Sequence, residues 1–146
     1  MKTDFTLDYN KENFEIIKGL ILENLSADLL PKKWVSKNQH NLMFGHCHTS
    51  SGCLQKVFGS NNITMYRGLD DEDLYHWWVV DKDGTLIDLT ADQYTSKGRI
   101  PPYDVGEKSQ MLGFSYKLRV KELYERVASA YNNKRTVLDF LDNETE

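Results

Sequence analysis

The stretch from Tyr75 to Thr90, YHWWVVDKDGTLIDLT, decides the fold that we expect for this chain. Two runs, 75–80 and 85–90, are rich in β-branched and aromatic residues and flank a short polar loop, which is the pattern of a β-hairpin. The loop contains Gly84, which suits the left-handed position after a type I turn. The stretch therefore predicts two antiparallel strands at the centre of the chain.

A three-residue loop sets the register of this hairpin and pairs Val80 with Leu86. Because side chains alternate across a strand, His76, Trp78 and Asp88 then share one face. His76 and Asp88 become diagonal neighbours, within reach of a hydrogen bond. A change of one residue in loop length would place them on opposite faces. The pairing of these two side chains thus depends on the turn.

Helices are predicted on the N-terminal side of the hairpin. Asn10 is a typical N-cap, and apolar residues at helical spacing follow it, which predicts a helix over roughly 11–25. A second helix is expected to begin at Cys47 and to present Leu54 and Val57 on its apolar face. Gly59 supplies its stop signal.

The remaining elements complete an α+β fold. A strand is expected at 63–67, and residues 95–110 are rich in glycine and proline, which indicates a long loop. A C-terminal helix with Ser115 as its cap follows, and a short apolar turn at 137–141 precedes the acidic tail. Residues 1–146 are expected to form one domain, in which the helix that begins at Cys47 packs on a small antiparallel sheet.

Composition excludes several classes of function. The 146 residues are 40% hydrophobic and 27% charged, an ordinary globular balance. The formal net charge of -4 argues against binding to nucleic acid or to an anionic membrane. No apolar run is long enough to span a bilayer, and the first residues do not resemble a signal peptide. A cytoplasmic location is expected, where Cys47 and Cys53 would stay reduced.

Cys47 is the strongest candidate for chemistry. A thiol in the first turn of a helix lies near unpaired N–H groups and the positive end of the helix dipole, both of which favour the thiolate. Gly45, two residues earlier, allows a substrate to approach the backbone closely. A buried structural cysteine is the alternative. The hairpin favours the nucleophile, because a carboxylate that orients a histidine, which in turn deprotonates a thiol, is the arrangement of covalent catalysis.

The order cysteine, histidine, aspartate resembles the papain-like and transglutaminase-like cysteine enzymes. Five segments also resemble a family of small, largely uncharacterised phage and prophage proteins, over roughly residues 43–127. These segments are Gly45 to Ser51, His76 to Trp78, Asp81 to Gln93, Gly113 to Ser115 and Lys117 to Arg119. Two positions depart from that family: His48 replaces an aromatic residue after the cysteine, and Leu89 replaces a proline after the aspartate.

The resemblance and the motif together predict a thiol hydrolase or acyltransferase, such as a cysteine peptidase or amidase. Cys47 is the expected nucleophile, His76 the general base and then acid, and Asp88 the residue that orients His76. The substrate would be an amide, peptide, isopeptide or thioester in a protein or peptide-like molecule, and no cofactor is implied. The alternative is a non-catalytic phage-encoded binding protein that inhibits a factor in the host cytoplasm by surface contact.

Four further residues are candidates for substrate binding or for an oxyanion hole. Gln39 and Asn41 precede Cys47 by eight and six residues, and a side-chain amide there could donate to a developing oxyanion. Gln93 closes the Thr-Ala-Asp-Gln string of the resemblance. Of two adjacent tryptophans on a strand one is expected in the core, and the other, Trp78, could form the wall of a substrate groove.

Metal sites are less well supported. His46, Cys47 and His48 are adjacent and lack the usual spacing of zinc ligands, even with His40 and Cys53 nearby. Asp81-Lys82-Asp83-Gly84 begins like a calcium loop, but its twelfth position is Asp92 where glutamate is required. A turn explains this stretch better.

The acidic run 70–73 is expected to be a solvated loop. His76, at a strand end beside an open site, is expected to contribute little to stability.

Overall fold

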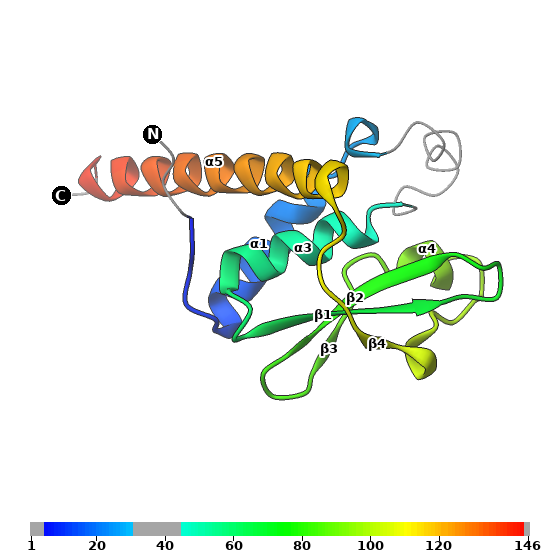
Figure 1. The fold of residues 1–146 in the computed structure, drawn as a ribbon. Coiled ribbons are helices and arrows are strands. Elements are labelled where there is room, and N and C mark those ends of the chain that lie inside the picture. The colour runs from blue at the N-terminus through cyan, green and yellow to red at the C-terminus, as the bar shows by residue number, and fades with distance from the viewer. Residues whose placement is uncertain (1–4, 31–44, 145–146) are drawn as a thin grey trace.

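The structure, a computed structural model, describes residues 5–30 and 45–144. It is an α+β fold with a small antiparallel sheet on one side and helices on the other (Figure 1). The elements in chain order are α1 (Lys11–Asn24), η1 (Ala27–Leu29), α3 (Cys47–Phe58), β1 (Ile63–Leu69), β2 (Tyr75–Asp81), β3 (Leu86–Ile87), α4 (Asp92–Thr95), η2 (Tyr103–Val105), β4 (Glu107–Lys108) and α5 (Phe114–Glu144).

The sheet has the strand order β3-β2-β1-β4, with antiparallel neighbours throughout. The predicted hairpin register is confirmed, because Val80 pairs with Leu86 and the N–H of Asp81 donates to the carbonyl of Thr85 at 2.9 Å. Gly84 has φ 87°, the left-handed conformation expected after the turn. The second strand is shorter than predicted, since only Leu86–Ile87 pair with β2.

Helix α3 lies between the sheet and the other helices (Figure 1). It spans Cys47–Phe58 as predicted and ends at Gly59, whose φ is 91°. Ten of its twelve residues are buried, because β1 and β2 cover one side and α1 and α5 cover another. The core includes Ile17, Ile21, Cys53, Leu54, Val57, Met65, Val79, Leu123 and Val127. A central helix with this degree of burial holds its N-terminus firmly in place.

The N-terminal helix also agrees with the sequence prediction. Helix α1 spans Lys11–Asn24, and the side chain of Asn10 accepts a hydrogen bond from the N–H of Asn13 at 2.8 Å. This is the N-cap geometry that the sequence indicates. The chain before it packs against α3, where the N–H of Leu7 donates to the carbonyl of Val57.

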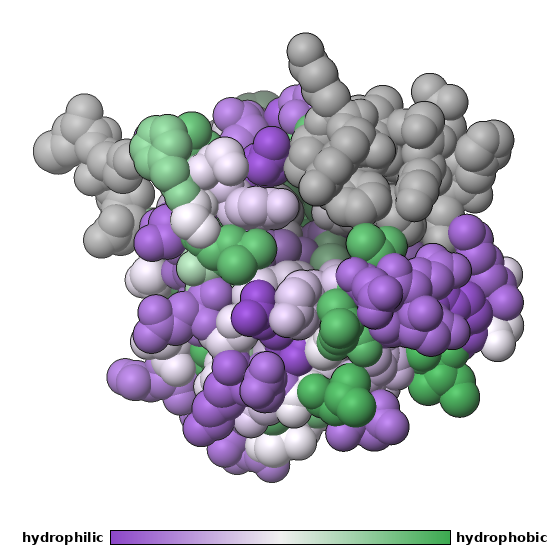
Figure 2. All heavy atoms as spheres, turned by 45° about the vertical axis from the view of Figure 1, so that its right-hand side comes forward, coloured by the Kyte–Doolittle hydropathy of each residue, from purple (hydrophilic) through white to green (hydrophobic). Residues whose placement is uncertain are grey.

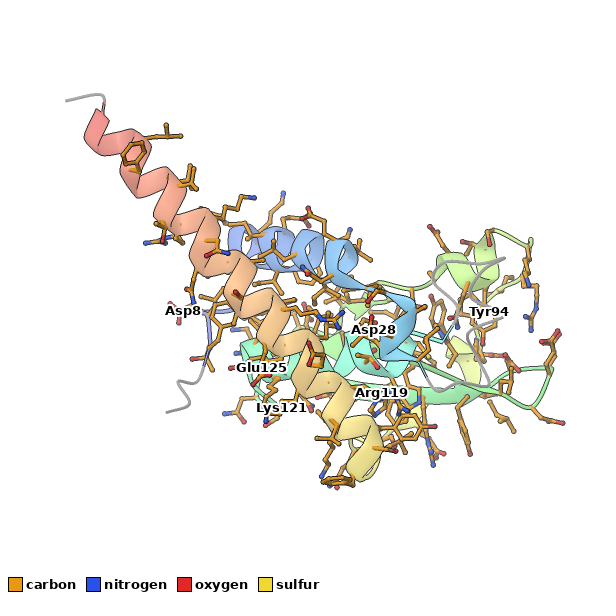
Figure 3. The ribbon with its side chains drawn as sticks, turned by 90° about the horizontal axis from the view of Figure 1, so that it is seen from above. Asp8, Asp28, Tyr94, Arg119, Lys121 and Glu125 are labelled. Atoms are coloured by element: carbon orange, nitrogen blue, oxygen red, sulfur yellow. The ribbon has the colours of Figure 1, made fainter. Side chains whose placement is uncertain are left out.

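The C-terminal helix differs from the prediction. Helix α5 begins at Phe114, and the N–H of Lys117 donates to the carbonyl of Gly113, so Ser115 lies inside the first turn and is not the cap. The expected turn at 137–141 is part of the same continuous helix. Its last turns extend beyond the other elements (Figures 1 and 3), because the run of helix-forming residues contains no breaker. None of the helices in the described ranges has the length and hydrophobicity needed to cross a membrane.

The expected loop at 95–110 is partly ordered into η2 and β4. It lies against the sheet at two glycines. A Cβ on Gly68 would lie 2.5 Å from the carbonyl oxygen of Pro102, and a Cβ on Gly106 would lie 2.2 Å from the ring of Trp78. The absence of side chains at these positions lets the segment cover the sheet face that carries Trp78 and brings Tyr103 towards the hairpin.

Candidate functional site

His76 and Asp88 meet as the hairpin register predicts. Nε2 of His76 lies 2.6 Å from Oδ2 of Asp88, and both side chains are almost entirely buried. The other carboxylate oxygen, Oδ1, accepts the backbone N–H of Thr90 at 3.1 Å. The carboxylate is therefore held from two sides, which fixes the orientation of the imidazole.

Cys47 completes the arrangement from a different element. It is the first residue of α3, follows Gly45 in a left-handed conformation (φ 86°), and is 7% exposed. Its thiol interacts with the imidazole of His76 and raises the pKa of that ring. Because Nε2 of His76 faces Asp88, Nδ1 is the ring nitrogen that can exchange a proton with the thiol. The three residues predicted as a catalytic triad thus lie together.

The electrostatics of His76 favour the imidazolium. Burial by itself lowers the pKa of the ring, but hydrogen bonds to Asp88 and Cys47 and the negative charges of both groups outweigh burial and raise the pKa to about 9. A proton taken from the thiol is therefore well accommodated on His76. This is the property required of a base that must activate a sulfur nucleophile.

Gln93 is the fourth predicted residue that the structure brings to this site. The short helix α4 buries its amide beside the imidazole, with Nε2 of Gln93 2.8 Å from Nδ1 of His76. The amide oxygen accepts the N–H of Gly45 at 3.3 Å, which orients the NH2 group towards the ring. In this arrangement the neutral His76 carries its proton on Nε2 and leaves Nδ1 as an acceptor.

The other predicted substrate-binding residues do not join the site. Gln39 and Asn41 lie outside the described residues. Trp78 is on the same strand face as His76, but residues of the 101–106 segment cover it, and its ring centroid lies 5.1 Å from that of Tyr103. The prediction that Trp78 is a groove wall is wrong. Trp77, on the opposite face, borders a cavity beside Cys47.

Sequence reasoning missed two tyrosines that support the site. Tyr103 donates from its hydroxyl to Oδ2 of Asp88 at 2.7 Å. The ring of Tyr94 lies edge-on to His76 at 4.7 Å between centroids, and its hydroxyl donates to Asp70 at 2.6 Å. Tyr94 lies at the end of the molecule opposite the C-terminus of α5 (Figure 3). The only sequence signal for Tyr94 is its position directly after Gln93, which was itself a predicted site residue.

Asp70 also corrects the prediction that the run 70–73 is fully solvated. Its side chain is 5% exposed, accepts from Tyr94, and accepts the N–H groups of Glu72 and Leu74 at 2.8 and 3.0 Å. Arg99 forms ion pairs with this cluster. The acidic run therefore anchors α4 to the sheet end that carries His76.

The two histidines next to Cys47 are buried, and His48 has structural partners. His48 accepts the N–H of Leu112 on Nε2 at 3.0 Å, and its ring lies edge-on to Trp77. Burial lowers the pKa of both His46 and His48 to about 4, so both are neutral. Within residues 5–30 and 45–144, no three His, Cys, Asp or Glu side chains form a group that could hold a metal. Oδ1 of Asp81 caps the hairpin turn, as the turn interpretation predicts.

The fold and the site define an α+β protein in which a helix-start cysteine, a strand histidine and an aspartate meet in a buried cluster. The chain belongs to the YunG family, whose model, described as YunG protein, matches residues 12–133. This match includes Cys47, His76 and Asp88, as well as Gln93. No curated protein and no solved structure matches the chain. The resemblance to phage proteins and to papain-like or transglutaminase-like enzymes therefore stays a prediction.

Proposed function

We propose that this protein is a cysteine-dependent hydrolase or acyltransferase that cleaves an amide, peptide, isopeptide or thioester bond through an acyl-enzyme. The observation that carries the proposal is that His76 contacts both Cys47 and Asp88. The nucleophile comes from α3, the base from β2 and the orienting carboxylate from the segment directly after β3, and each side chain is buried. A purely structural cysteine does not need a charged partner of this kind.

The reaction follows from the positions of the protons. His76 takes the thiol proton of Cys47, and the sulfur attacks the carbonyl carbon of the substrate to form a tetrahedral intermediate. The C–N or C–S bond to the leaving group then breaks, and the leaving group receives the proton from His76. In hydrolysis, water gives a proton to His76 and attacks the thioester, which releases the acid and restores the thiol. In transfer, an amine or another acceptor replaces the water.

Gln93 supports this mechanism through its amide. While His76 is neutral, Nδ1 accepts from the NH2 group of Gln93. Once Nδ1 carries the thiol proton, the form that the raised pKa of His76 favours below about pH 9, it can no longer accept, and the NH2 group must leave Nδ1. The same NH2 group can then donate to the oxyanion together with the N–H of Cys47 at the start of α3. Formation of the nucleophile and exposure of the oxyanion donor would thus be coupled.

The alternative function, a non-catalytic binding protein, would use a different surface. Large apolar side chains are exposed along α5, namely Phe114, Leu118, Val137, Leu138, Phe140 and Leu141. In contrast, the described residues on the face drawn in Figure 2 form only small hydrophobic groups among hydrophilic ones. An inhibitor that acts by contact through α5 has no need of Cys47, so the two functions respond differently to its substitution.

The deciding experiment is labelling with a thiol electrophile, followed by mapping of the modified cysteine. Cys53 is the internal control, because it is fully buried and burial raises the pKa of its thiol. We expect the label on Cys47, and its loss in Cys47→Ser. A labelled Cys53 with an unreactive Cys47 would contradict the enzyme. An effect on a partner that persists in Cys47→Ser would favour the binding protein.

A further inference from the structure

A cavity of about 250 Å³ opens beside Cys47. Cys47 and Gln93 border it on the side of the cluster, and other walls come from the start of β2, the start of α5 and the segment between β4 and α5. A group bound there would lie next to a carbonyl carbon under attack by the sulfur. The cavity is therefore a candidate site for the part of the substrate that neighbours the reacting bond.

The walls of this cavity are apolar and aromatic. Trp77, Leu112 and Tyr116 line it, together with Leu74 and Tyr75. His48 is also a wall residue, and its ring packs edge-on against Trp77 and Tyr116 at 4.7 and 5.3 Å between centroids. Because Nε2 of His48 accepts the N–H of Leu112, the imidazole is fixed as a neutral aromatic surface. No cation lines the cavity among the described residues.

A charged residue at the rim of the cavity further restricts which substrate groups can bind. Asp73, which has a positive φ of 60°, is exposed at the edge of the cavity. It is the one wall residue in the described part of the chain with a fixed formal charge at neutral pH. A substrate carboxylate would lose its hydration at the apolar walls and meet the like charge of Asp73 at the rim, and both effects disfavour its binding. The guanidinium groups of Arg67 and Arg119 stack on the rings of Tyr75, Trp77 and Tyr116 but do not line the cavity.

We infer that this cavity binds one uncharged apolar or aromatic group of the substrate, attached close to the reacting carbonyl, and that it excludes carboxylates. The inference rests on the proposed thiol chemistry and specifies its substrate class. The volume agrees with a group of this size: a cavity of about 150 Å³ in another protein accommodates benzene, and drug-sized ligands need roughly 300–1,000 Å³.

The test uses labelling of Cys47 and needs no known substrate. Three reagents are compared: chloroacetamide, N-benzyl chloroacetamide and its para-carboxylate. Each rate is divided by the rate of the same reagent with glutathione. Burial of the phenyl ring should make the benzyl reagent at least about tenfold more effective than chloroacetamide, and the carboxylate should lose that gain. Equal normalised rates for all three reagents would overturn the inference.

Variants locate the effect in this cavity. Leu112→Lys puts a cation on the wall of the cavity, so the carboxylate reagent should now label Cys47 faster than the benzyl reagent. Each rate is expressed relative to that of iodoacetamide with the same variant. Leu118→Lys is the matched control, because Leu118 is an exposed leucine of α5 that does not line this cavity. It should keep the wild-type order. Tyr116→Lys provides a second wall position if Leu112→Lys does not fold.

The outcomes separate this inference from the proposed function. If Cys47 reacts with chloroacetamide in a manner that depends on His76, but shows no preference for the benzyl group, the thiol chemistry stands and the apolar cavity is wrong. If Leu118→Lys reverses the order as strongly as Leu112→Lys, the preference comes from overall charge and the cavity assignment is also wrong. If Cys47 does not react with any of the reagents, the proposed function itself fails.

Discussion

The hydroxyl of Tyr103 lies 2.7 Å from Oδ2 of Asp88, the same oxygen that faces Nε2 of His76 at 2.6 Å. One carboxylate oxygen therefore serves two donors, one from the hairpin and one from the segment that covers the sheet. This shared acceptor ties the position of the 101–106 segment to the orientation of the histidine. It also means that the site depends on a residue well outside the hairpin.

Tyr103→Phe tests this connection. The change removes a donor from a buried carboxylate, so the free energy of unfolding should fall by about 1–3 kcal/mol. Labelling of Cys47 should slow by less than about tenfold, since His76 keeps its bond to Asp88. Denaturant unfolding and labelling rates measure the two effects. Tyr131→Phe, at a half-buried tyrosine of α5 that does not line the cavity, is the control and should change neither. An unchanged stability for Tyr103→Phe would contradict the role of its hydroxyl.

Gly106→Ala tests the same segment through packing. A methyl group there would meet the ring of Trp78 at 2.2 Å, so the segment or the ring must shift. The expected cost is about 1–3 kcal/mol of stability, with a loss of the Tyr103 contact. Gly113→Ala is a suitable control, since a Cβ at Gly113 meets no atom within 4 Å. Equal stability of the two variants would show that the segment does not pack closely on Trp78.

Iodoacetamide should modify Cys47 faster than Cys53 near neutral pH. Cys47 stands at a helix N-terminus beside His76, whereas burial raises the pKa of the Cys53 thiol and closes it to reagents. Peptide mapping at several reaction times measures both rates. Comparable rates for the two cysteines would remove the main physical argument for a nucleophile.

His76→Ala should abolish turnover by several orders of magnitude, because the proton is then neither accepted nor returned. A surrogate is the alkylation of Cys47 as a function of pH. In the wild type, the pKa of His76 is raised to about 9, and the positive charge of its ring should keep alkylation of Cys47 fast at a lower pH than in the variant. In His76→Ala fast alkylation should require a higher pH, and Asp88→Asn should lie between them. Identical pH profiles for folded wild type and folded His76→Ala would show that His76 does not affect the reactivity of Cys47.

The burial of His76 changes the expected effect of this variant on stability. The sequence predicts an exposed strand-end histidine of little structural importance, but the residue is 0% exposed and hydrogen-bonded on both ring nitrogens. Loss of the imidazole leaves the buried carboxylate of Asp88 with one donor fewer. The free energy of unfolding should then fall by on the order of 3 kcal/mol. Folding of His76→Ala must therefore be verified by circular dichroism before its alkylation profile is interpreted.

Acid should destabilise the protein between about pH 6.5 and pH 4. Burial lowers the pKa of His46 and His48 from 6.5 to about 4, so in this window the unfolded chain binds protons that the folded chain does not. The free energy of unfolding therefore rises with pH there, by on the order of 3 kcal/mol for each histidine. Below pH 4 both states are protonated and this contribution is gone.

His48→Gln isolates one of the two histidines, because its amide oxygen can still accept the N–H of Leu112 but does not titrate. Its stability should vary less between pH 4 and 6.5 than that of the wild type, as measured by urea unfolding. Asp70 and Asp81 affect stability at lower pH. Burial raises the pKa of each carboxyl group, but hydrogen bonds from tyrosine hydroxyls and backbone N–H groups outweigh burial and lower the pKa below the usual range. Identical pH slopes in the two proteins would contradict a buried neutral His48.

The elements that depend on local chemistry could be predicted from residue type and spacing. The Asn10 cap, the Cys47 start and Gly59 end of α3, and the left-handed Gly84 of the hairpin each follow from a residue that its backbone position requires. The hairpin register then determined that His76 and Asp88 would meet, because strand alternation leaves no other arrangement for a three-residue loop. The helix-start cysteine, the histidine and the aspartate could therefore be selected from residue type and spacing alone.

Only the tertiary structure decided which further side chains surround this cluster. Tyr103 reaches Asp88 because Gly68 and Gly106 let its segment pack on the sheet, and no local pattern encodes contacts between segments that are distant in the sequence. The alternation of Trp77 and Trp78 was predictable, but both faces of the sheet are covered, so both side chains are buried, and of the two it is Trp77 that borders the cavity. Side-chain periodicity specifies a face, whereas packing against distant segments decides what that face meets.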